Sequence, residues 1–257
     1  MKKQGYALVT GASKGIGYEI VKYLLAKNYK VIAVSRNTQT LDNLNKNFTN
    51  IILEKWNYDL SDLNQVKNMI ENCKNFDIQL VINNEGYGVW GSFLKTSLEK
   101  ELNMIDLNIK SLHYITKHFA KNFYKNNLGR IINVASVAAF QPGPMFSSYF
   151  ASKAYVLNLG IAINTEFKKL KSKVRVVTIC PGPIKTDFWL RSDYKNINKS
   201  HGMRVEKYVN KTLKKALKTN SKDFLLTGIV NKFNKLLVKI IPQKIILSHI
   251  YRMQKDK

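Results

Sequence analysis

Short, uninterrupted apolar runs alternate with amphipathic stretches along the first 180 residues of this chain. Strands are expected at residues 6–9, 31–34, 51–53, 80–82, 130–135 and 174–179. Helices are expected at about 15–27, 38–47, 61–73, 97–125 and 149–170. Such runs are typical of parallel strands buried on both faces, and helical crossovers join parallel strands with one hand. The pattern predicts an α/β fold, a doubly wound parallel sheet forming a single domain over residues 1–257 with a helical C-terminal tail.

A glycine-rich loop follows the first expected strand and opens the first expected helix. It reads Thr10 to Gly17, TGASKGIG. Gly11 permits a tight turn, and the other glycines remove side chains where backbone must approach a pyrophosphate. The helix N-terminus presents free N–H groups to the phosphates. The context favours a Rossmann-type dinucleotide site over an ordinary βα turn, with expected cofactor contacts from Gly11, Ser13, Lys14, Gly15, Ile16 and Gly17.

The end of the second strand bears on which dinucleotide binds. It reads Val34-Ser35-Arg36-Asn37 and holds no acid for a ribose diol. Arg36 offers a bidentate fork for a 2′-phosphate, Ser35 a hydrogen bond and Lys14 a second cation. The alternative is that Arg36 is an ordinary surface arginine. We favour NADP(H) over NAD(H).

Three residues form a candidate catalytic group. Tyr149 and Lys153 are four residues apart, on one helix face, and Ser136 ends the preceding strand, where α/β sheets bind ligands. A neighbouring ammonium is expected to lower the pKa of the phenol, so that Tyr149 exchanges a proton with an alkoxide or alcohol. Ser136 is expected to polarise a substrate carbonyl. The alternative for Tyr149 alone is a half-buried core tyrosine.

These motifs resemble the short-chain dehydrogenase/reductase family over nearly all of residues 1–190. The resemblance implies an Asn-Ser-Tyr-Lys tetrad in which Asn108 holds a water that relays protons to Lys153, and Lys153 binds the nicotinamide ribose. It implies transfer to the B face of the nicotinamide and a homodimer or homotetramer. It also implies adenine contacts from Asp59 and Leu60, an adenosine pocket closed by Asn83 and Gly86, and a carboxamide segment made of Pro181, Gly182, Ile184 and Thr186.

One residue departs from the family pattern. Glu85 stands where the family usually has a small alanine. Its carboxylate either points harmlessly to solvent, which we favour, or crowds and repels the cofactor.

The substrate side is predicted to be apolar. Aromatic and other residues between Ser136 and Tyr149 are candidates for the pocket wall, and residues 184–203 for a substrate lid. The alternative is that these aromatics are packing residues. A hydrophobic small-molecule carbonyl or alcohol is expected, and Lys185 and Arg191 leave a substrate carboxylate open. The candidates are Phe140, Gln141, Pro142, Met145 and Phe146, with Phe188 and Trp189 at the start of the lid.

The cysteine, histidine and charge content of the chain bears on its location and on its possible partners. Cys73 and Cys180 form no CxxC pair and the four histidines form no ligand pattern, so we expect a reducing, cytoplasmic location and no metal site. No transmembrane helix is expected. The net charge of +25 is read as a lysine-rich bias rather than attraction to a polyanion or to the cofactor phosphates. Without an arginine cluster or an RNA motif, no nucleic-acid partner is expected.

The tail from 228 to 257 is basic and amphipathic. Apolar residues from Ile229 to Ile241 recur at helical spacing, with lysines elsewhere on the wheel. We rank packing over the pocket or against a sister subunit ahead of a membrane surface. Together these features predict an NADP(H)-dependent oxidoreductase acting on a carbonyl or secondary alcohol. The alternatives are a dinucleotide-sensing protein with little turnover and a membrane-surface or nucleic-acid binder.

Overall fold

Seven strands form one parallel sheet in the computed structural model, which describes the chain except for residues 1–4, 49–50, 189–191, 193–201, 219–221 and 256–257. Their order is β3-β2-β1-β4-β5-β6-β7. The order reverses between β1 and β4, which creates the crevice where such sheets bind ligands. The strands are β1 (Tyr6–Thr10), β2 (Lys30–Ser35), β3 (Leu53–Asn57), β4 (Ile78–Asn83), β5 (Arg130–Val134), β6 (Arg175–Cys180) and β7 (Phe224–Leu226).

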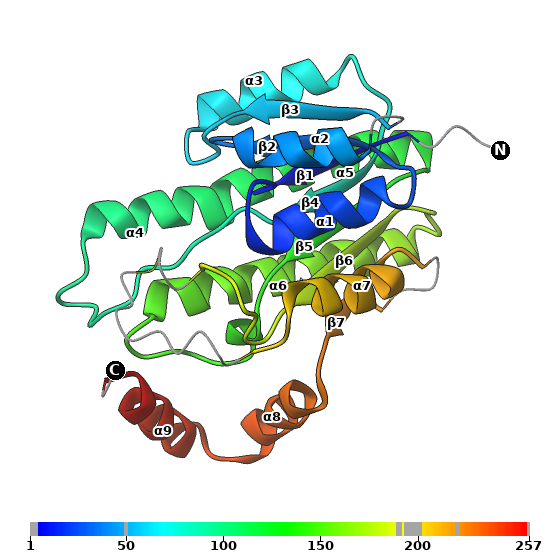
Figure 1. Cartoon of the computed structure of the whole chain (residues 1–257). Helices are drawn as coiled ribbons and strands as arrows, with labels where there is room; N and C mark the ends of the chain where they lie inside the picture. The colour runs from blue at the N-terminus through cyan, green and yellow to red at the C-terminus, as the bar shows by residue number, and fades with distance from the viewer. Residues whose placement is uncertain (1–4, 49–50, 189–191, 193–201, 219–221, 256–257) are drawn as a thin grey trace.

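Helices cover both faces of the sheet (Figure 1). The helices α1, α2 and α7 pack on one face, and α3, α5 and α6 on the other. The helices α8 and α9 lie outside these layers, beyond β7 (Figure 1). The bounds are α1 (Gly15–Leu25), α2 (Asp42–Asn47), α3 (Leu63–Cys73), α4 (Leu98–Ile105), α5 (Leu112–Asn126), α6 (Ser147–Lys169), α7 (Val205–Ala216), α8 (Ile229–Ile240) and α9 (Gln243–Lys255).

The core explains why the strands read as continuous apolar runs. In β1, Ala7 and Val9 join a cluster with α1 and α7, whereas Leu8 joins the cluster on the opposite face. Successive side chains of a strand point to opposite faces, so a sheet covered on both sides needs apolar residues at every position. The predicted doubly wound sheet is therefore confirmed.

Several predicted boundaries were wrong. The third strand runs over Leu53–Asn57 rather than 51–53, because this edge strand has one buried residue, Leu53, followed by alternating partly buried and exposed residues rather than an apolar run. The helix expected at 97–125 is two α-helices joined by a π-helical turn, Asp106–Ser111. The short strand β7 was not distinguished from the helical tail.

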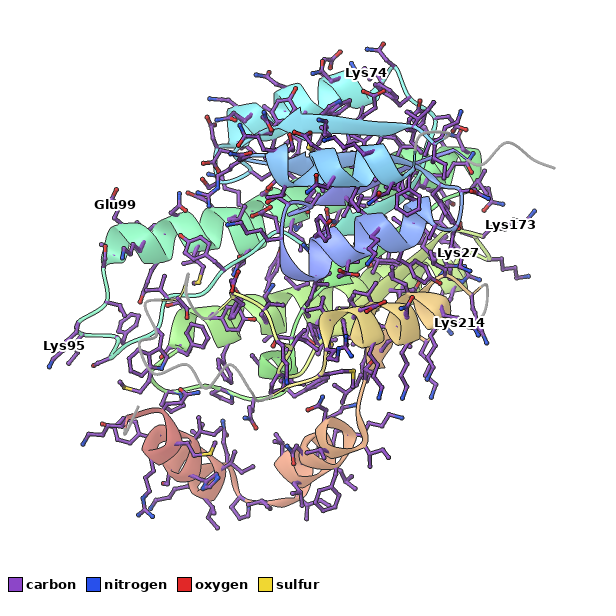
Figure 2. All side chains as sticks on the ribbon, viewed as in Figure 1. Lys27, Lys74, Lys95, Glu99, Lys173 and Lys214 are labelled. Carbon is purple, nitrogen blue, oxygen red and sulfur yellow. The ribbon has the colours of Figure 1, made fainter. Side chains whose placement is uncertain are left out.

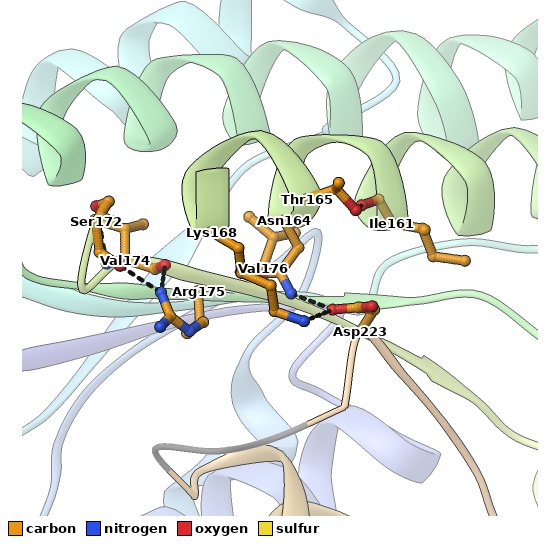
Figure 3. Close-up of polar contacts among 9 residues, drawn as sticks. All are labelled: Ile161, Asn164, Thr165, Lys168, Ser172, Val174, Arg175, Val176 and Asp223. Atoms are coloured by element: carbon orange, nitrogen blue, oxygen red, sulfur yellow. Dashed lines mark hydrogen bonds and ion pairs between the residues drawn. The ribbon is translucent and has the colours of Figure 1, made fainter. Parts of the chain in front are cut away.

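A polar cluster fixes the edge strand β7 to α6 (Figure 3). The Asp223 carboxylate, just before β7, accepts a hydrogen bond from Asn164 Nδ2 at 2.6 Å and pairs with the Lys168 ammonium. Asn164 Oδ1 accepts from the Val176 N–H at 2.8 Å, which links β6 to the same cluster. Although burial acts to raise it, these hydrogen bonds hold the pKa of Asp223 below its ordinary value. The cluster therefore fixes the residue at which β7 begins.

Candidate cofactor and active site

Two neighbouring hollows open at the carboxyl ends of the strands. A small hollow of about 410 Å³ is lined by Arg36, Asp59 and Leu60, among others. A large hollow of about 880 Å³ is lined by the glycine loop, Tyr149 and much of α8. Lys14 and Glu85 line both. The two hollows therefore follow one another along a path suited to an extended ligand.

The glycine loop fits a pyrophosphate. Gly11 and Gly15 have φ of 65° and 55°, a region that L side chains rarely adopt. A Cβ on Gly17 would lie 2.0 Å from the Gly11 carbonyl oxygen. Asn84 Nδ2 donates to the carbonyl oxygens of Thr10 and Gly11, both at 3.1 Å. The loop is therefore a fixed, side-chain-free cradle at the N-terminus of α1, as a dinucleotide requires.

The residues after β2 divide into supporting and lining groups. Ser35 is buried, and its Oγ lies 2.8 Å from Ser13 Oγ. Neither serine lines a hollow. Arg36 is exposed and lines the small hollow together with Lys14. Arg36 and Lys14, the two cations expected for a 2′-phosphate, therefore line the same small hollow, whereas Ser35 supports the glycine loop through Ser13.

The expected adenosine contacts are only partly in place. Asp59 and Leu60 line the small hollow, and Asp59 Oδ1 accepts hydrogen bonds from Ser61 N and Oγ at 2.9 and 2.7 Å. Asn83 instead lies in the core, where its Nδ2 donates to Asn133 Oδ1 at 2.9 Å. Its neighbour Asn84 lines the large hollow and holds the glycine loop, a role that the sequence analysis missed.

Tyr149 and Ser136 meet on the wall of the large hollow. The Ser136 hydroxyl lies near enough to the phenol to lower the pKa of Tyr149. The Tyr149 ring stacks on Phe146, with centroids 4.5 Å apart, and lies 5.4 Å from the Phe188 ring. Lys153, one turn further along α6, has its Nζ 5.7 Å from the Tyr149 ring centroid and donates to the Val134 carbonyl at 3.1 Å. Three members of the expected tetrad thus line one hollow.

Burial controls the pKa values of these groups. It raises the pKa of the Tyr149 phenol to about 12, against a smaller lowering by the hydrogen bond with Ser136. It lowers the pKa of Lys153 to about 8. The expectation that the lysine lowers the phenol pKa thus fails for the chain by itself, because desolvation penalises both charged forms. At neutral pH Tyr149 holds a proton that it can donate.

Asn108 lies in the π-helical turn and is held on both sides. Its Nδ2 donates to the Tyr87 carbonyl at 2.8 Å and to Ser152 Oγ at 3.1 Å. A Cβ on Gly86 would lie 2.8 Å from Asn108 Oδ1 and 3.3 Å from Lys153 Nζ. The amide oxygen and the ammonium therefore border the same side-chain-free point at Gly86.

The segment after β6 closes the large hollow. Pro181, Gly182, Ile184 and Thr186 all line it. The Thr186 methyl lies 3.3 Å from where a Gly15 Cβ would be, so this segment meets the glycine loop. Trp189 and Arg191, with most of the expected lid, lie outside the described residues.

The substrate side is less uniformly apolar than the sequence predicted. Phe140, Gln141 and Phe146 line the large hollow, whereas Pro142 and Met145 do not. The helix α8 adds polar groups that the sequence analysis missed: Asn231, Asn234 and Lys235. Lys235 Nζ lies 4.2 Å from the Phe224 ring centroid and 5.2 Å from that of Phe140. The sequence analysis had set this lysine apart from the apolar residues of the helix but had not placed it at the hollow.

Glu85 does not take the orientation we favoured. Its Oε2 lies 2.9 Å from where a Cβ of Gly11 would be. The carboxylate therefore lies against the glycine loop, on the side of both hollows, rather than pointing to solvent. The second interpretation, that it crowds the cofactor, has the structural support.

No cluster of three or more His, Cys, Asp or Glu side chains suited to a metal occurs among the described residues. Within the same ranges, no helix has the length and apolarity needed to cross a bilayer.

Comparison with known proteins agrees with this geometry. A family model described as short chain dehydrogenase matches residues 5–196. An uncharacterised oxidoreductase of Schizosaccharomyces pombe is 34% identical over 72% of this chain and 62% of its own length. A short-chain dehydrogenase of Sphingobium yanoikuyae, solved with NADPH, is 24% identical with a TM-score of 0.79, over 93% of this chain and 96% of its own. A 4-hydroxyisoleucine dehydrogenase solved with NADH and succinate is 24% identical with a TM-score of 0.72, over 85% and 95%. The chain belongs to the short-chain dehydrogenase family.

Proposed function

We propose that this protein is an NADP(H)-dependent oxidoreductase that moves hydride between the nicotinamide and a carbonyl or secondary alcohol. One observation carries the proposal. The Tyr149 phenol, one helical turn from Lys153, lines the same hollow as the Ser136 hydroxyl, and this hollow continues to the glycine loop. A proton donor, an oxygen-binding hydroxyl and a dinucleotide cradle are the parts that carbonyl reduction requires.

The chain's own residues account for the proton chemistry. Bound NADPH would supply the hydride. The Ser136 hydroxyl and the Tyr149 phenol both donate hydrogen bonds to the substrate carbonyl oxygen, which draws electron density from the carbon. Tyr149 then gives its proton to the oxygen as negative charge develops there. The Lys153 ammonium stabilises the resulting phenolate, and Asn108 is placed to position a water that returns the proton.

Loss of the phenol proton is the test of this mechanism. Tyr149→Phe keeps the ring packed against Phe146 and Phe188 but removes the acid. We expect NADPH oxidation with a panel of ketones and aldehydes to fall by at least about 100-fold, with NADPH affinity retained. Tyr155→Phe, a change of the same kind on the same helix, is the matched control. Activity that survives in Tyr149→Phe would overturn the proposal.

The preference for NADP(H) is supported by Arg36 and Lys14, which line the small hollow beside Asp59. We expect Arg36→Gln to raise the KM for NADPH about tenfold and to leave that for NADH unchanged, because only the 2′-phosphate needs the guanidinium. Arg204→Gln, at another exposed arginine, is the control. A wild-type KM lower for NADH than for NADPH would contradict this preference.

The aromatic wall supports a hydrophobic substrate, and Lys235 keeps an anionic group on it open. We place the reaction in the cytoplasm, since both cysteines are buried thiols. A homodimer or homotetramer remains a prediction.

A second candidate is a dinucleotide-binding protein with little turnover. The Glu85 carboxylate at the glycine loop favours it, because a negative charge there opposes tight cofactor use. Stoichiometric NADPH binding without turnover of any carbonyl in the panel would support this candidate.

A further inference from the structure

The helix α8 turns polar residues toward the large hollow and leaves apolar residues exposed on its outer face. It lines the large hollow with Ile229 and Val230 at its N-terminal end and with Asn231, Asn234, Lys235 and Val238 along its inner face, so half of these residues are polar. Its outer face carries an apolar stripe at spacings of three and four residues. The stripe consists of Phe233, Leu236 and Ile240, which are 58%, 53% and 70% exposed. A surface helix of a soluble protein normally buries its apolar stripe against the core.

The next helix along the chain, α9, also carries exposed apolar residues. Ile245, Tyr251 and Met253 are 61%, 43% and 49% exposed. Figure 2 shows the side chains of both helices extending from the lower edge of the molecule. Exposed apolar residues that gather on adjoining helices, rather than being scattered singly, mark an interaction surface.

The charges of this surface identify its partner. Residues 229–255 contain no aspartate or glutamate. They carry six cations, of which Lys235 faces the hollow and five are exposed: Lys232, Lys239, Lys244, Arg252 and Lys255. An apolar stripe flanked by lysines is the pattern of a helix that lies in the plane of an anionic bilayer. A second copy would instead bring like charges together with no carboxylate on this surface to offset them.

We propose that α8 and α9 form a docking surface for an anionic lipid bilayer. The apolar stripe enters the boundary between headgroups and acyl chains, and the lysines contact the lipid phosphates. Helices of 12 and 13 residues suit this in-plane placement.

If the proposed function holds, docking to a bilayer would affect how the substrate reaches the active site. The inner face of α8 lines the hollow that contains Tyr149, so the wall of the active site would adjoin the lipid. A ketone or alcohol dissolved in the bilayer could then reach Tyr149 with little exposure to water.

Vesicle co-sedimentation of the full chain tests the docking surface. The vesicles are phosphatidylcholine alone or phosphatidylcholine mixed with phosphatidylglycerol. One variant is Phe233→Gln, Leu236→Gln and Ile240→Gln; the second is Lys232→Gln, Lys239→Gln and Lys244→Gln. None of these residues lines a hollow. The control changes three exposed lysines of α7, Lys207, Lys211 and Lys214, to glutamine (Figure 2 labels Lys214).

We expect the wild type and the α7 control to bind the anionic vesicles, and both α8 variants to lose at least about tenfold in partitioning. High salt should weaken the binding. Equal binding to both vesicle types, equal losses in all variants, or no binding would overturn the proposal. So would a wild-type dimer that the apolar variant dissociates while neither protein binds vesicles. NADPH affinity and turnover, measured without vesicles, verify that each variant is folded and test the proposed function separately.

Discussion

Removing the charge of Glu85 is expected to tighten cofactor binding. The carboxylate lies against the glycine loop, where a pyrophosphate would bring like charge. At a separation of roughly 6 Å and an effective dielectric constant of about 20, two unit charges repel by about 3 kcal/mol. Partial exposure of Glu85, and the cations Lys14 and Arg36 in the same hollow, reduce this to about 1 kcal/mol. That corresponds to about a fivefold lower Kd for NADP+.

Two variants separate charge from size. Glu85→Gln removes the charge and keeps the volume, whereas Glu85→Ala removes both. Calorimetric titration with NADP+ at low and high salt should show about a fivefold tightening for Glu85→Gln that shrinks as salt screens the charge. A further gain in Glu85→Ala would measure crowding. Glu99→Gln, at an exposed residue of α4 (Figure 2), is the charge-matched control. Unchanged or weaker binding by Glu85→Gln at low salt would refute the electrostatic argument.

Three further changes test the site and its support. Lys153→Met should abolish turnover yet raise the free energy of unfolding at pH 7 by about 1–3 kcal/mol, because burial holds the lysine pKa near 8. The gain should shrink as pH rises above 8, where the wild-type lysine loses its proton, and urea unfolding at pH 7 and 9 measures it; equal gains would contradict the cause. Asp223→Asn should cost about 1 kcal/mol at neutral pH, since the paired carboxylate has a lowered pKa. That cost should vanish as pH falls below the ordinary value of 3.8, as thermal unfolding can follow. Gly17→Ala should abolish NADP+ binding in a calorimetric titration, because its Cβ would lie 2.0 Å from the Gly11 carbonyl oxygen.

Local spacing made part of the site predictable. Tyr149 and Lys153 share a helix face because they are four residues apart, and Ser136 reaches them because parallel strands end at one edge of the sheet. Neither argument needs knowledge of distant contacts. The glycine loop was predictable for the same reason, since strand, turn and helix are consecutive in the sequence.

Other roles depended on which way a side chain turns. Asn83 and Asn84 are adjacent and chemically identical, yet one bonds to Asn133 in the core and the other holds the glycine loop. Strand alternation requires that neighbouring residues differ, but it does not specify which one faces the ligand. The orientation of Glu85 was predicted wrongly for the same reason. A long side chain after a strand end can turn either way, and its packing against distant residues determines which way it turns.

The orientation of the tail helix α8 could not be predicted from its sequence either. Helical periodicity located the apolar stripe of α8 correctly, but periodicity defines an axis and not the direction of the core. Contacts from outside the helix set that direction. A Cβ on Gly182 would lie 2.2 Å from Asn231 Nδ2, so Asn231 fits over a position without a side chain, and the Lys235 ammonium lies over the Phe224 ring. These contacts turn the polar face inward and leave Phe233 and Leu236 outward. The helix does line the pocket, as one of the predicted alternatives had it, and Ile229 and Val230 take part in that lining. Phe233 and Leu236 do not, and the same orientation that brings polar groups to the substrate hollow leaves them on the surface we assign to lipid.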